Sequence, residues 1–117
     1  MNLPTKPLTW NTGLLSGVKH AFALQKRKRR RTVWQRATPE EYQWLKTQPQ
    51  IEELGDFLFL APAIEDELWL LVERTWHGFP DPPLYAFLAF DLEGKLIAGG
   101  DLDCLPKAWT LPKPQTL

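Results

Sequence analysis

The densest group of binding side chains in this sequence is a run of six consecutive bases at residues 26–31. Clustered Lys and Arg displace counterions from a phosphate backbone, which gives affinity for nucleic acid of any base sequence. The same charges beside apolar residues suit an anionic membrane, and they also pair with the carboxylates of an acidic protein surface. The alternative is a solvated arm, or one that folds back onto the chain's own acids. We expect an anion-binding site at Lys26, Arg27, Lys28, Arg29, Arg30, Arg31 and Arg36.

The distribution of charge supports this expectation. The formal net charge of the 117 residues is zero, but residues 1–36 hold nine bases and no acid. Residues 37–117 hold five bases and all 14 acids. Such asymmetry between two parts of one chain is typical of a basic segment that contacts an anion.

A second group of residues has the spelling of a nuclease signature. Asp81 is followed by Glu93, Gly94 and Lys95, and in such signatures Asp and Glu hold a metal ion while Lys assists the attacking water. Here, however, Glu93, Gly94 and Lys95 fall where a hairpin turn is expected, with Gly supplying a positive φ. A small metal-dependent nuclease is therefore kept only as the alternative function.

The sequence gives little support for metal binding or catalysis by cysteine and histidine. Cys104 is the only cysteine, and His20 and His77 are the only histidines, so neither a structural zinc site nor a thiol nucleophile is expected. We expect Cys104 to be a small buried apolar residue, and we expect no metal and no cofactor. A single cysteine cannot form an internal disulfide, which favours a reducing, cytoplasmic location.

The elements that would position the bases begin with an amphipathic stretch. Helical spacing over residues 13–25 predicts a short helix that runs into the basic run. The apolar residues of this region are candidates for docking on a partner: Trp10, Leu14, Val18 and Phe22.

A second helix is predicted over residues 39–54. Thr38 supplies a capping hydroxyl, Pro39 suits the first helical position, and Glu41 stands three residues after the cap. Pro49 interrupts this stretch.

From residue 57 the apolar period changes to two, which predicts four strands over residues 57–63, 67–76, 84–91 and 95–102. The short connections favour an antiparallel meander, so the predicted fold is α+β, with the capped helix packed on the four-stranded sheet. Both faces of the sheet are apolar. The helix at 39–54 can cover one face, and the other requires the helix at 13–25, the Trp10 segment or a partner. Tyr85 and Phe87 alternate in a way that could stack bases, but core packing is favoured.

These observations predict three regions: a basic arm at 1–36, an α+β domain at 37–105 and an irregular Pro-rich tail at 106–117. No apolar run approaches the roughly 18 residues of a transmembrane segment. We expect a non-enzymatic binding or assembly subunit that docks on a larger protein or nucleoprotein complex. Its basic arm would contact nucleic acid, an acidic protein surface or an anionic membrane, and the sequence does not choose among them.

Overall fold

The structure is a computed structural model. It describes residues 8, 14–48, 57–61, 64, 66–73 and 84–112, with only the backbone described for residues 14–18. Among the described helices none is long and apolar enough to cross a membrane.

The centre of the molecule is a five-stranded antiparallel sheet in the order β2-β3-β4-β5-β6. Strands β3 (Phe57–Leu60), β4 (Glu67–Glu73), β5 (Tyr85–Asp91) and β6 (Leu96–Leu102) are neighbours in chain order, as in a meander. The prediction of four strands is wrong in number. A fifth strand, β2 (Gln35–Arg36), pairs with β3 at the edge of the sheet. Two residues show no apolar period, so the sequence pattern could not reveal this strand.

The turn between β5 and β6 is closed by local bonds. Gly94 has φ 82°, and the Asp91 carboxylate accepts hydrogen bonds from the backbone N–H groups of Glu93 and Lys95 at 2.9 and 3.0 Å. The expectation that Glu93, Gly94 and Lys95 form a turn is confirmed.

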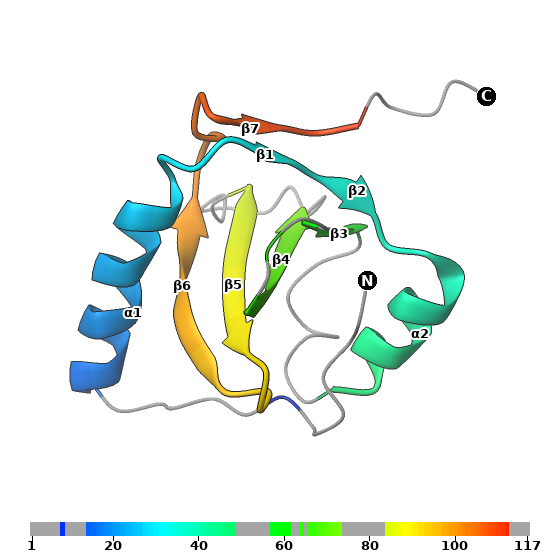
Figure 1. Cartoon of the computed structure of the whole chain (residues 1–117), viewed down its shortest axis with the longest axis horizontal. Coiled ribbons are helices and arrows are strands. Elements are labelled where there is room, and N and C mark those ends of the chain that lie inside the picture. The colour runs from blue at the N-terminus through cyan, green and yellow to red at the C-terminus, as the bar shows by residue number, and fades with distance from the viewer. Residues whose placement is uncertain are drawn as a thin grey trace, which may run out of the picture.

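The sheet is apolar on both faces because each face is covered by another part of the same chain. Alternation along the strands divides the core into two clusters. One lies beneath α2 (Pro39–Lys46), which contributes Leu45, and beneath Leu8. The other lies beneath α1 (Leu14–Arg27), which contributes Leu24, and beneath Trp34 and Trp109. In Figure 1, α1 stands beside β6 and α2 lies on the opposite side of the sheet. The sequence left open what covers the second face of the sheet. In the structure, other parts of the same chain cover it.

Helix α2 begins with a complete capping box. The Thr38 hydroxyl accepts from the Glu41 N–H at 3.2 Å, and the Glu41 carboxylate accepts from the Thr38 N–H at 2.9 Å. The helix ends at Lys46 with Thr47 as its C-cap, so the predicted extent to residue 54 is too long. Pro49 disfavours helical conformation at the residue before it. Residues 50–54 lie outside the described part of the chain.

Helix α1 packs closely on β6 at Gly100. A Cβ atom at Gly100 would lie 2.9 Å from Leu24 Cδ2, so the missing side chain allows this close approach. The helix continues to Arg27, two residues into the basic run, with Lys26 and Arg27 in its last turn. Cationic side chains there complement the negative end of the helix dipole.

A two-stranded parallel ribbon crosses one end of the sheet (Figure 1). It pairs β1 (Thr32–Val33) with β7 (Trp109–Thr110), and the Thr32 and Trp34 N–H groups donate to Ala108 and Thr110 carbonyls at 2.9 and 2.8 Å. Leu24 and Trp34 from the predicted arm and Trp109 from the predicted tail all belong to one core cluster. The packed core therefore extends across both predicted region boundaries, at residues 36/37 and 105/106.

Candidate anion-binding groove

Four aromatic rings hold the ribbon against the sheet. Trp34, Trp69, Phe87 and Trp109 are all buried, and every pair among them is in ring contact, with centroids 5.1–6.3 Å apart. Tilted and edge-on pairs of this kind are favourable beyond the burial of their area. The buried rings of Trp34 and Trp109 therefore anchor the backbone of the neighbouring residues to the core.

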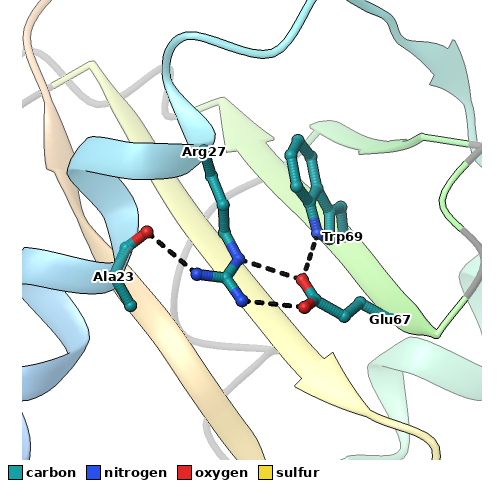
Figure 2. A network of polar contacts seen from close by, with 4 residues as sticks. All are labelled: Ala23, Arg27, Glu67 and Trp69. Carbon is teal, nitrogen blue, oxygen red and sulfur yellow. Dashed lines mark hydrogen bonds and ion pairs between the residues drawn. The ribbon is translucent and has the colours of Figure 1, made fainter.

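Arg27 ties the end of α1 to β4 (Figure 2). Its guanidinium donates from Nε and Nη2 to the two Glu67 carboxylate oxygens at 2.9 and 2.8 Å, and from Nη1 to the Ala23 carbonyl at 2.9 Å. Trp69 Nε1 donates to the same carboxylate at 2.7 Å. The Arg27 carbonyl accepts from Trp109 Nε1 at 3.3 Å. The Arg27 side chain, predicted to bind an external anion, already holds an internal one.

This network changes the acidity of Glu67. Burial alone raises the pKa of Glu67, but hydrogen bonds from Arg27 and Trp69 and the positive charges of Arg27 and Arg30 lower it by more, so the pKa lies below its ordinary value. The carboxylate therefore stays ionised and paired at neutral pH.

Five of the other predicted bases lie at or just after the end of α1, and the sixth, Arg36, lies in β2 at the edge of the sheet. Lys26, Arg29, Arg30 and Arg31 are exposed, while Lys28 and Arg36 are partly buried. Two of them lie over aromatic rings, Arg30 over Trp69 at 5.9 Å and Arg36 over Phe59 at 5.6 Å. The run is thus not one uniform patch, because its members face different parts of the fold.

Three bases come together in a shallow groove of about 670 Å³ along the ribbon. Thr32, Trp34 and Trp109 are buried, whereas their neighbours Arg31, Val33 and Thr110 are exposed. The groove is lined by Arg29, Arg31, Val33, Lys107, Ala108 and Thr110. Sequence reasoning missed Lys107, an isolated base in a Pro-rich segment. The parallel pairing of β1 with β7 brings it beside the basic run.

The predicted docking residues are only partly described. Phe22 is 71% exposed on α1, with Lys19 and Lys26 exposed three residues before it and four after it. Leu14 and Val18 lie in α1, but their side chains are outside the described part of the structure, as is all of Trp10. Their role as docking residues stays a prediction.

The residues of the nuclease alternative are not brought together by what the structure describes. Glu93 and Lys95 are exposed in the turn after β5, and Asp81 lies outside the described residues. Within the described ranges, no group of three or more His, Cys, Asp or Glu side chains could hold a metal ion. Cys104 is exposed, contrary to the expectation of burial, because it follows the last strand of the sheet in a bend.

Comparison with protein-family models, with curated proteins and with solved structures found no match for this chain.

Proposed function

We propose that this chain is a non-enzymatic binding subunit whose basic groove contacts the phosphate backbone of a nucleic acid within a larger nucleoprotein assembly. The observation that supports the proposal is the meeting of Arg29, Arg31 and Lys107 from two distant segments in one groove. Their backbone is held by the β1–β7 ribbon and, behind it, by the buried aromatic rings.

Phosphate suits the chemistry of this lining. Guanidinium groups donate paired hydrogen bonds to phosphate oxygens, an ammonium adds a compact charge, and a hydroxyl such as that of Thr110 donates one more bond. The groove is also open, as it must be for a polymer that passes along the surface.

The charges elsewhere on the fold would orient such a ligand. Helix α2, across the sheet from α1, carries Glu40 and Glu41 in its first turn, and the β5–β6 turn carries Asp91 and Glu93. These acids repel a polyanion from α2 and from the β5–β6 turn. The exposed acids Asp101 and Asp103 lie at the end of β6, a few residues before Lys107 in the chain, so a bound strand has to pass to one side of them.

The test compares two triple variants that remove the same charge. The groove variant, Arg29→Ala/Arg31→Ala/Lys107→Ala, removes the three basic side chains that line the groove. The control variant, Lys19→Ala/Lys26→Ala/Lys95→Ala, removes three exposed bases that do not line it. Binding to a labelled oligonucleotide is measured by fluorescence anisotropy over a series of KCl concentrations. The groove variant should bind weakly and lose about two units of the salt slope on a single strand, or nearly three on a duplex. The control variant should keep most of the wild-type slope, and both should keep the wild-type melting temperature.

Four results would contradict the proposal. Equal losses in the two variants would show that total charge matters and the groove does not. Capture of partners from lysate that survives nuclease treatment, without oligonucleotide binding, would indicate an acidic protein surface. Binding to vesicles containing phosphatidylserine, again without oligonucleotide binding, would indicate a membrane. In the same assay with Mg²⁺ added, the oligonucleotide should remain intact, and its cleavage would favour the nuclease alternative.

A further inference from the structure

A second pocket adjoins the basic groove and has a different lining. It encloses about 310 Å³ and shares Arg31 and Val33 with the groove. Its other walls include Arg30, Gln35, Ala61 and Ile64. The two hollows are therefore neighbours on one continuous surface, on either side of Arg31 and Val33.

The lining of this pocket is mainly apolar and includes the planar guanidinium and amide groups of Arg30, Arg31 and Gln35. Ala61 is buried and Ile64 is half-buried, while Val33 is 62% exposed between the two hollows. The Arg30 guanidinium lies 5.9 Å from the centre of the Trp69 ring. Gln35 is exposed at the start of β2 and offers an amide with both a donor and an acceptor.

Apolar side chains, guanidinium planes and one amide suit a flat, heteroaromatic group with polar edges. Bases of a single strand can leave their stack and lie against apolar or guanidinium surfaces, whereas bases of a duplex stay paired inside the helix. An amide can then bond the exposed edge of the base. The adjoining groove supplies charge for the phosphates on the same strand.

We infer that the groove and this pocket together bind single-stranded nucleic acid, with phosphates in the groove and one unpaired base in the pocket. The inference rests on the proposed function and narrows its ligand from nucleic acids in general to single strands. Arg31, which lines both hollows, contacts the strand at the step from phosphate to base.

Three labelled oligonucleotides of equal length test the inference on the wild-type chain: a mixed-sequence single strand, a strand of the same phosphates with abasic sites, and a duplex. Stacking of a base on a protein surface is worth enough to change affinity by roughly tenfold. The mixed strand should therefore bind roughly tenfold more tightly than the abasic strand. It should also bind more tightly than the duplex at the same salt concentration.

Matched variants locate the effect. Gln35→Ala and Ile64→Ser should weaken binding of the mixed strand severalfold and leave binding of the abasic strand unchanged. Gln43→Ala, which removes an exposed amide on α2, should change neither. Because Gln35 is exposed, its replacement keeps the test valid even if Ile64→Ser lowers stability.

The outcomes separate the inference from the proposed function. Equal affinity for mixed and abasic strands, or a duplex bound as tightly as the single strand, would overturn the inference and leave the phosphate-binding groove in place. No binding to any of the three would overturn both. Equal losses for Gln35→Ala and Gln43→Ala would show that the pocket does not hold the base.

Discussion

At the scale of single residues, Arg27 joins three parts of the chain. Its guanidinium bonds a helical carbonyl of α1 and both oxygens of Glu67 on β4, and its backbone carbonyl accepts from the Trp109 indole on β7. The side chains of Arg27 and Glu67 are 18% and 23% exposed. Removing one member of such an ion pair destabilises the folded state, because the charge that remains is only partly hydrated.

Replacing Arg27 by Ala should lower the free energy of unfolding by about 1.5–3 kcal/mol, the usual worth of hydrogen bonds to a charged group. Arg29→Ala removes the same charge from an exposed position and should stay within about 0.5 kcal/mol of wild type. Urea unfolding followed by circular dichroism measures both. Equal stability of the two variants would mean that the Arg27 pair contributes nothing.

Glu67 should make the stability depend on pH in the acid range. Its pKa is lower in the folded chain than in the unfolded chain, so the folded state binds its proton less readily. The resulting stabilisation is complete above the unfolded value of about 4.3 and is lost as the pH falls through the folded value. The urea midpoint of wild type should therefore fall from pH 6 to pH 3, and that of Glu67→Gln should fall less. Parallel pH profiles for the two proteins would contradict this assignment.

At the scale of elements, α2 depends on its first turn. It has eight residues and only one buried side chain, Leu45, and short helices are marginal by themselves. Thr38→Ala removes the capping hydroxyl and should destabilise the chain by about 1 kcal/mol, whereas Thr38→Ser keeps the hydroxyl and should cost much less. Thermal melting compares the two. If Ser were as damaging as Ala, the hydroxyl would not be the stabilising group.

The helices and strands differ in how clearly the local sequence predicts them. The capping residues at 38–41 and the apolar runs of β4 and β5 are local signals, and the structure contains the capped helix and both strands. Strands β1, β2 and β7 have two residues each. They exist because distant segments pair, and no local pattern of such length can indicate them.

At the scale of the whole molecule, one sheet joins two core clusters. Phe90 lies in the cluster under α2 and Phe87 in the cluster under α1, and neither is exposed to solvent. Because both side chains belong to β5, the clusters share their backbone. A domain built in this way should unfold in one cooperative transition.

Phe90→Ala and Phe87→Ala should each cost about 3–5 kcal/mol, the usual range for a buried Phe. Each should lower a single transition that far-UV and near-UV circular dichroism report at the same temperature. The near-UV signal includes the buried rings of the Phe87 cluster, so it tests whether damage at Phe90 reaches the other face. Separate transitions in Phe90→Ala would show that the two layers unfold independently, and an unchanged melting temperature would contradict the burial of Phe90.

The sequence by itself determined the mixed α+β class, the apolar central strands, the turn at Gly94 and the concentration of bases before residue 37. Each of these depends on residue type and on spacing within a few positions. Only the tertiary structure decided which bases meet. Arg27 turns to Glu67, whereas Arg29 and Arg31 join Lys107 across the ribbon. The reason is that the direction of a side chain follows from which neighbours its backbone pairs with, and here the pairing of β1 with β7 and of α1 with β6 joins residues far apart in the chain.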